Sequence, residues 1–189
     1  GLVIARVAVH FHPAQVVSFG LALNAAAFAV LAFLGAHNDV VIILIFIVLG
    51  TGIGIAQTIS NDLMLSSVPP RKAGAASAIS ETSYETGAVL GTVIIGGMLT
   101  AIYRANIVMP AGLDETLSNH AHETLGGAVT VAHHVGGEQA NQLLSSAFAA
   151  FDSGVVLSSA FSAVLMGVMA VISYLMIRKA PREMKPAEH

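Results

Sequence analysis

The sequence contains no cysteine, and only 10% of its 189 residues carry a charge at neutral pH. Without cysteine the chain has neither disulfide bonds nor thiolate metal sites. Soluble domains contain about 25% charged residues, so this chain has too few to cover a water-exposed surface. Hydrophobic residues make up 55% of the chain, and its mean hydropathy is +0.78. These values predict an integral membrane protein with an all-α fold.

Positive charge is also scarce, since the chain has 8 lysines and arginines and a net charge of -3. No basic patch with interleaved aromatic residues is present, so nucleic acid is not an expected partner. No basic segment precedes an apolar stretch at the start, so we expect no signal peptide. The sequence starts without methionine, which predicts a piece of a larger protein. No nucleophile–base set and no metal-ligand spacing occur, so we expect neither an enzyme nor a bound cofactor or metal.

Four apolar stretches are long enough to cross a bilayer, which takes about 20 mostly apolar residues. We therefore expect a polytopic membrane helix bundle with an extracytoplasmic helical hairpin. The predicted elements are a helix end over 1–9, spanning helices over 14–36, 40–61, 71–104 and 153–177, a hairpin loop over 110–152 and a tail over 178–189.

The positive charges predict the orientation. Seven of the eight fall on one side of the four-helix path, and only Arg104 falls on the other. Short loops rich in lysine and arginine stay in the cytoplasm, so we expect a cytoplasmic C-terminus and an outward hairpin. The seven are Arg6, Arg71, Lys72, Arg178, Lys179, Arg182 and Lys185.

Apolar residues recur at helical spacing in two runs of the outward segment, 113–135 and 143–151, and Gly136-Gly137 separate the runs. This pattern predicts two short amphipathic helices; a disordered loop is the alternative. Four histidines in this segment could bind a metal or sense pH, although solvated loop histidines are the commoner case. They are His120, His122, His133 and His134.

Glu81 and Glu85 are the only charged residues between Ala73 and Tyr103. At the helical rise they lie about 12 and 18 Å from Ala73, in a hydrocarbon core about 30 Å thick. A desolvated carboxylate near a second one favours its protonated form, and in its charged form it attracts cations. A proton-coupled exporter of cations needs both behaviours in alternation. The alternative is a neutral glutamate that bonds a neighbouring helix.

Glycines inside the predicted spans favour close helix packing, because small residues let helices approach in lipid. Sliding of a helix during a conformational cycle is the alternative for those near the glutamates. A polar pair, Asp62 and Arg71, could form an ionic gate at the cytoplasmic face; a simple polar helix end is the alternative. The packing candidates are Gly50, Gly54, Gly87, Gly91 and Gly96.

The run Ser66–Thr82 (SSVPPRKAGAASAISET) and the glycines that follow it resemble the penultimate-helix region of a known family. The family is the fourteen-helix drug:proton antiporters of the major facilitator superfamily, of the EmrB/QacA/SmvA type. The run Ala150–Gly154 and the hairpin before the last helix also resemble it. Glu81 and Glu85 match positions implicated there in cation recognition and proton coupling. Some relatives have two adjacent acids where this sequence has Ser80-Glu81.

The resemblance implies a C-terminal part of a transporter: the last four membrane helices and the end of a fifth. It also implies a bacterial inner-membrane location and export of hydrophobic, often cationic compounds such as quaternary ammonium biocides and dyes. The expected partners are the lipid bilayer, protons, these drugs and the N-terminal part of the transporter. We expect that this chain alone inserts but does not transport. A self-contained four-helix channel or scaffold subunit is the alternative, and the sequence upstream of the first residue would distinguish the two.

Overall fold

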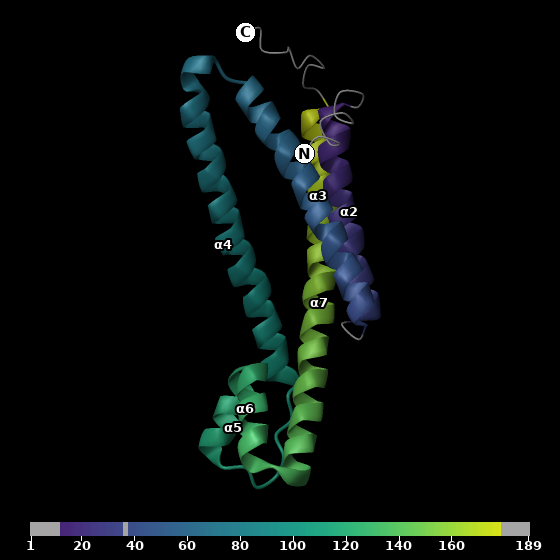
Figure 1. Ribbon diagram of the computed structural model, residues 1–189, viewed down its shortest axis with the longest axis vertical. Coiled ribbons are helices and arrows are strands. Elements are labelled where there is room, and N and C mark those ends of the chain that lie inside the picture. The colour runs from purple at the N-terminus through teal and green to yellow at the C-terminus, as the bar shows by residue number, and fades with distance from the viewer. Residues whose placement is uncertain (1–11, 36–37, 179–189) are drawn as a thin grey trace. The chain divides into compact units, whose positions relative to one another are not determined.

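The computed structural model describes residues 12–35 and 38–178, which form helices and no strand. Four helices are long and apolar enough to cross a membrane (Figure 1): α2 (Pro13–Leu34), α3 (Asp39–Ser66), α4 (Ala73–Asn106) and α7 (Gly137–Ile177). A 3-10 turn, η1 (Pro70–Lys72), precedes α4, and α5 (Glu115–Glu123) and α6 (Leu125–Val135) precede α7. The chain is an all-α, multi-pass membrane helix bundle. The predicted helix end over 1–9 and nearly all of the predicted tail lie outside the described residues.

Local sequence accounts for the helix ends. α2 starts at Pro13, where a missing N–H costs nothing because the first turn has no partner for it. It ends at Gly35, which has a positive φ of 64° and donates its N–H to the carbonyl of Leu31 at 2.9 Å. Asn38 begins α3, since its Oδ1 accepts the N–H of Val40 at 3.0 Å. Short polar and glycine signals therefore separate the first two spans.

The chain divides into two compact units, each with its own apolar core. The first unit holds most of α2, all of α3, α4 up to Val89 and α7 from Phe161. The second unit holds the last residues of α2 (31–34) and the rest of α4 and of α7, together with α5 and α6. We describe the two units separately.

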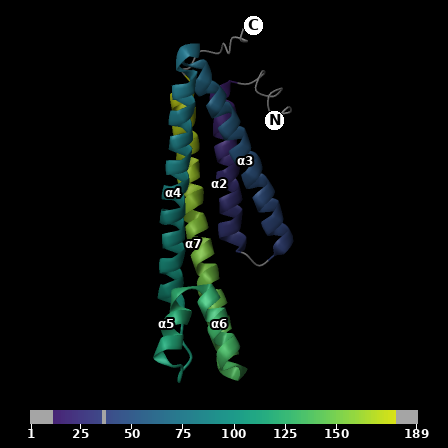
Figure 2. The same cartoon turned by 60° about the vertical axis from the view of Figure 1, so that its left-hand side comes forward.

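In the first unit α2 and α3 run antiparallel and are in contact (Figure 2). α3 buries Ile45, Gly52 and Ile59, which are seven residues apart, the spacing of a left-handed coiled coil. A Cβ added to Gly20 of α2 would lie 2.7 Å from the carbonyl oxygen of Gly52, and one added to Gly52 would lie 2.6 Å from that of Gly20. The two backbones therefore touch, and only glycine fits on either side.

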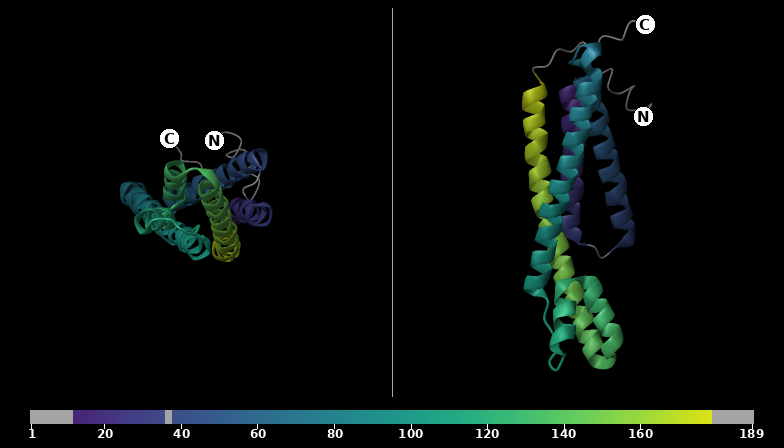
Figure 3. Two further views of the ribbon diagram at one scale, coloured as in Figure 1. Left: turned by 90° about the horizontal axis from the view of Figure 1, so that it is seen from below. Right: turned by 90° about the vertical axis from the view of Figure 1, so that its left-hand side faces the viewer.

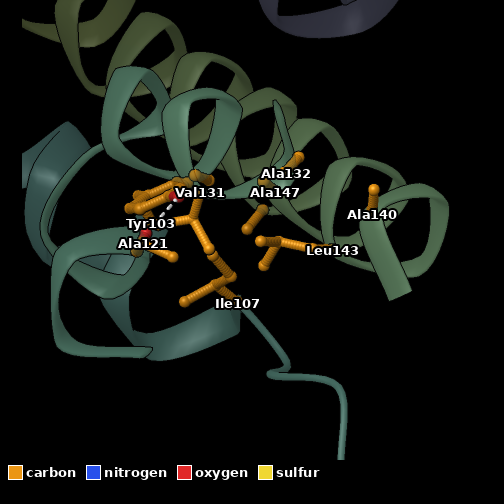
Figure 4. Packing of buried hydrophobic residues seen from close by; sticks show 10 residues of the cluster. Tyr103, Ile107, Ala121, Val131, Ala132, Ala140, Leu143 and Ala147 are labelled. Carbon is orange, nitrogen blue, oxygen red and sulfur yellow. Dashed lines mark hydrogen bonds between the residues drawn. The ribbon is translucent and has the colours of Figure 1, made fainter. Parts of the chain in front are cut away.

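In the second unit the core surrounds Tyr103, near the end of α4 (Figure 4). Tyr103 is 1% exposed, and its hydroxyl donates to the carbonyl oxygen of Ala121 on α5 at 2.9 Å. The backbone N–H of Val108 donates to Ser146 Oγ on α7 at 2.7 Å. α5 and α6 thus pack beside the first turns of α7 and are tied to the end of α4 (Figure 3). The other buried members are Ile107, Ala121, Ala128, Val131, Ala132, Ala140, Leu143, Ala147 and Ala150.

Replacing Tyr103 by Phe tests how firmly this core holds the hairpin. The variant removes one buried hydrogen bond and leaves the Ala121 carbonyl without its donor, so we expect a loss of about 1–2 kcal/mol in stability. The measurement is thermal unfolding of the purified full-length protein, followed by limited proteolysis at the hairpin. Tyr174→Phe is the control, because the Tyr174 side chain is 42% exposed. Equal stability of wild type and Tyr103→Phe would contradict this role.

One continuous helix joins the second apolar run of the predicted hairpin to the last predicted span. The sequence predicted a hairpin over 110–152 and a separate span from 153, but α7 is one continuous helix from Gly137 to Ile177. The first apolar run forms two helices, α5 and α6, and the second run forms the first turns of α7. No proline lies near 152, and the Ser153 hydroxyl donates within the helix to the carbonyl oxygen of Ala149 at 2.9 Å. The real break is at Gly136 and Gly137, which both have positive φ.

Candidate functional site

Glu81 and Glu85 lie in the first half of α4, which begins at Ala73. Residues four apart on an α-helix differ by about 40° around the axis and about 6 Å along it. The two carboxylates therefore form a doublet on one face of a membrane-length helix. Their buried neighbours on α4, Ala76 and Ser80, lie on a different side of the helix.

The hydroxyl groups beside the doublet are satisfied within α4. Those of Thr82, Ser83 and Thr86 each donate to the carbonyl oxygen four residues earlier, at 2.7–2.8 Å. Such bonds let a hydroxyl group sit in an apolar environment. Glu81 and Glu85 have no equivalent, because the structure gives neither side chain a hydrogen bond or ion pair within the part of the chain that it describes. The carboxylates are thus available to a proton or to a ligand.

Every residue of α4 from Glu81 to Ile94 is exposed in this chain. This stretch carries apolar side chains on several sides, including Val89 and Val93, as well as the carboxylate doublet. Intramembrane carboxylates usually face a bundle interior or a water-filled cavity rather than lipid. The exposure therefore indicates a helix with room for further protein or ligand around the doublet.

The structure does not bring together Asp62 and Arg71, which the sequence proposed as a cytoplasmic gate. Asp62 lies in the last turns of α3, Arg71 lies in η1, and both are exposed. The extended backbone of Pro69 separates the two elements, and the described residues contain no ion pair between them. Arg71 is also ten residues from Glu81, about 15 Å along a helix, so it does not neutralise the doublet.

The five glycines predicted to pack helices face open space in this chain. A Cβ at any of them would meet nothing within 4 Å of the described structure. Their role therefore stays a prediction, and it requires contacts with helices outside this chain. The close contacts occur instead at Gly20 and Gly52, and at Gly154 of α7, where a Cβ would lie 3.1 Å from the carbonyl oxygen of Leu99. The predicted set is Gly50, Gly54, Gly87, Gly91 and Gly96.

Asn24 of α2 is a buried polar residue that was not among the residues predicted from the sequence. Asn24 is only 3% exposed, and its Oδ1 is buried without a hydrogen-bond partner among the described residues. A Cβ added to Gly52 would overlap with this oxygen, so a Cα–H bond of Gly52 points at it, a weak contact worth about 0.5–1 kcal/mol. The available signal was an amide side chain in the middle of a predicted span, four residues after Gly20.

The described residues contain no group of three or more His, Asp or Glu side chains placed to hold a metal ion. His120 and His122 lie on α5, and His133 and His134 end α6. All four side chains are exposed.

Comparison with known proteins identifies relatives that match between 71% and 100% of the chain. The multidrug efflux pump LfrA of Mycolicibacterium smegmatis is 42% identical over 181 residues, which cover 95% of this chain and 36% of the relative. The methyl viologen resistance protein SmvA of Salmonella typhimurium is 35% identical over 71% of this chain and 27% of its own length. The tetracenomycin C resistance and export protein of Streptomyces glaucescens is 25% identical over 100% of this chain and 36% of its own length.

No protein-family model and no solved structure matches the chain. The chain spans about a third of the length of the relatives that it matches. The likeness to LfrA runs through all four membrane-length helices, because it covers nearly the entire sequence. The chain therefore belongs to the multidrug efflux and resistance proteins of the major facilitator superfamily.

Proposed function

We propose that this chain is the C-terminal part of a transporter that exports hydrophobic, cationic compounds across a bacterial inner membrane in exchange for protons. In this proposal Glu81 and Glu85 of α4 carry the proton and bind the cation, and the chain does not transport by itself. The C-terminus and the α3–α4 connection face the cytoplasm, and α5 and α6 lie outside.

The observation that carries the proposal is the carboxylate doublet, which has no partner within the described chain and lies on a helix of membrane length. Keeping such groups in an apolar segment is costly, and they are usually kept for function. A carboxylate whose charge is not already neutralised can exchange a proton for an organic cation at the same oxygen atoms. Two carboxylates on one helix face also suit a cargo with one or two positive charges.

The relatives support the class of substrate. LfrA is named as a multidrug efflux pump, and SmvA as a protein of resistance to methyl viologen, which is an organic dication. Both names fit a site that recognises positive charge. The positive charges support the orientation, because Arg71 and Lys72 precede α4 and Arg104 alone lies at its other end.

In the exchange cycle the doublet alternately binds the cation and protons. Deprotonated carboxylates attract the cation from the inner side, and protonation from the outside removes the charge that holds it. Rocking of one helix bundle against the other then exposes the empty, protonated site to the cytoplasm. Two charged, unpaired carboxylates are costly in a low-dielectric site, so the site holds either the cation or protons, and the proton gradient sets the direction of exchange.

Reconstitution of the full-length transporter tests the proposal. We expect ethidium export from proteoliposomes only when a proton gradient is imposed, and we expect each exported cation to move protons inwards, as read by an internal pH dye. A protonophore should abolish export. Vesicles that hold only residues 1–189 should show none. Export that continues at full rate without a proton gradient would overturn the coupling, and proton-driven export by the isolated chain would overturn the claim that other helices are needed.

A further inference from the structure

The crossing of α2 and α3 holds a polar group that the proposed function does not use. At this crossing Gly20 and Gly52 bring the two backbones into contact, and Asn24 places its amide against Gly52. The amide is 3% exposed, and its Oδ1 has no hydrogen-bond partner among the described residues.

No donor on α3 can reach this oxygen in the packing observed. The α3 residues on the buried side are apolar or glycine, and the hydroxyls of Thr51 and Thr58 are exposed and donate to their own helix at 2.7 Å. The burial is produced by this chain alone, so water, lipid or a further helix cannot reach Oδ1 either unless α2 and α3 move apart. The buried side of α3 consists of Ile45, Gly52 and Ile59.

We propose that Asn24 is a positioning residue that keeps the α2–α3 crossing easy to open during transport. An unpaired buried acceptor disfavours the tightly packed state, whereas a looser crossing gives the amide access to donors. The desolvation penalty of such a group corresponds to a change of about tenfold or more in the ratio of closed to open crossings. The proposal rests on the proposed function, because opening matters only if the helices rearrange.

Glycine contacts suit such an opening. Backbones that meet through glycine have no interlocked side chains, and their Cα–H contacts to carbonyl oxygens are individually weak. The crossing can therefore separate without unpacking large side chains. At the same point the unpaired amide of Asn24 destabilises the closed crossing, so the closed state is populated but can still open.

Asn24→Leu in the full-length transporter tests the proposal. Leucine has the same number and branching of side-chain heavy atoms as asparagine but no polar atom, so loss of the unpaired acceptor should stabilise the closed crossing. The probe is thiol labelling of Ala27→Cys, in a transporter whose cysteines outside this chain are replaced by serine. Ala27 is 4% exposed on the same helix. We expect Asn24→Leu to slow labelling about tenfold, to raise the midpoint of thermal unfolding, and to slow dye export in proportion.

A second variant keeps the test decisive if Asn24→Leu fails to fold. The hydroxyl in Asn24→Thr would bond within its own helix, as those of Thr51 and Thr58 do, so the unpaired atom is again removed and slower labelling is again expected. Thr51→Val is the matched control, because Thr51 is exposed and self-bonded, and it should leave labelling unchanged.

The outcomes separate this inference from the proposed function. Slower labelling with higher thermal stability and slower export supports a positioning role, because a residue that only packs would lose stability and activity together. Unchanged or faster labelling in both variants, or unchanged export, overturns it. Absence of export from the wild-type protein would overturn the proposed function, and labelling would then decide by itself whether Asn24 controls the crossing.

Discussion

The double variant Glu81→Gln/Glu85→Gln is expected to lower proton-driven export of a cationic dye at least about 30-fold, with the protein still inserted and folded. Glutamine keeps the size of the side chain but neither carries a charge nor exchanges a proton. Loss of one member of a desolvated charge pair costs about 2–5 kcal/mol, and 2 kcal/mol corresponds to about 30-fold. The measurement is the initial rate of ethidium export from proteoliposomes under an imposed proton gradient.

Single variants and a control complete this test. Each single variant should fall between the wild type and the double variant, because the remaining carboxylate still attracts a cation. Glu123→Gln on α5 is the control, since Glu123 is exposed and lies on a short helix outside the spans. Wild-type export by the double variant would remove the carboxylate doublet from the mechanism.

Gly52→Ala is expected to destabilise the α2–α3 pair by about 1–3 kcal/mol, as overpacking of a tight contact does. The new methyl group would lie 2.6 Å from the carbonyl oxygen of Gly20 and would overlap with Asn24 Oδ1. The pair must therefore separate. Thermal unfolding of the purified transporter should report a lower midpoint, and dye export should fall with it.

Neighbouring positions make this prediction specific. A methyl group on Gly54 would meet nothing within 4 Å in the described structure, so Gly54→Ala should be neutral here. Asn24→Ala should partly relieve Gly52→Ala, because it removes one of the two collisions and leaves the contact with Gly20. If Gly52→Ala and Gly54→Ala have equal effects, the crossing does not have the geometry described.

The four spans can be predicted from the apolar composition of the sequence. The residues at which the helices begin and end depend on the backbone conformation of single residues, which a hydropathy average does not contain. The sequence predicted a span over 153–177 because that stretch is long, apolar and free of charged residues. A single charged residue such as Asp152 does not end a helix that has already formed, so α7 continues through Asp152. The preceding helix, α6, ends at Gly136, which has a positive φ of 67°.

The glycine of α3 that packs against α2 could not be selected from composition alone. Gly50, Gly52 and Gly54 are alike in sequence, yet only Gly52 has the phase that faces α2. The seven-residue spacing of Ile45, Gly52 and Ile59 contains that phase and could have been used. The prediction of the carboxylate doublet depended on fewer assumptions, because a charge in a long apolar segment is unusual at any phase. The group that binds the doublet could not be predicted, because the described residues give the two carboxylates no hydrogen bond or ion pair.

The self-bonded hydroxyl groups beside the doublet have a consequence for selectivity. Thr82, Ser83 and Thr86 have each used their one O–H on the helix backbone and keep only lone pairs to offer outwards. In the proposed site the carboxylate oxygens and the lone pairs of Thr82, which is three residues from Glu85, would accept hydrogen bonds and repel negative charge, whereas Ser83 lies on the opposite face of α4. We therefore expect the proposed site to select compounds by the sign of their charge and not by a matching set of hydrogen-bonding groups. Chemically unrelated molecules can share a positive charge. Anionic compounds of the same size and hydrophobicity would be turned away.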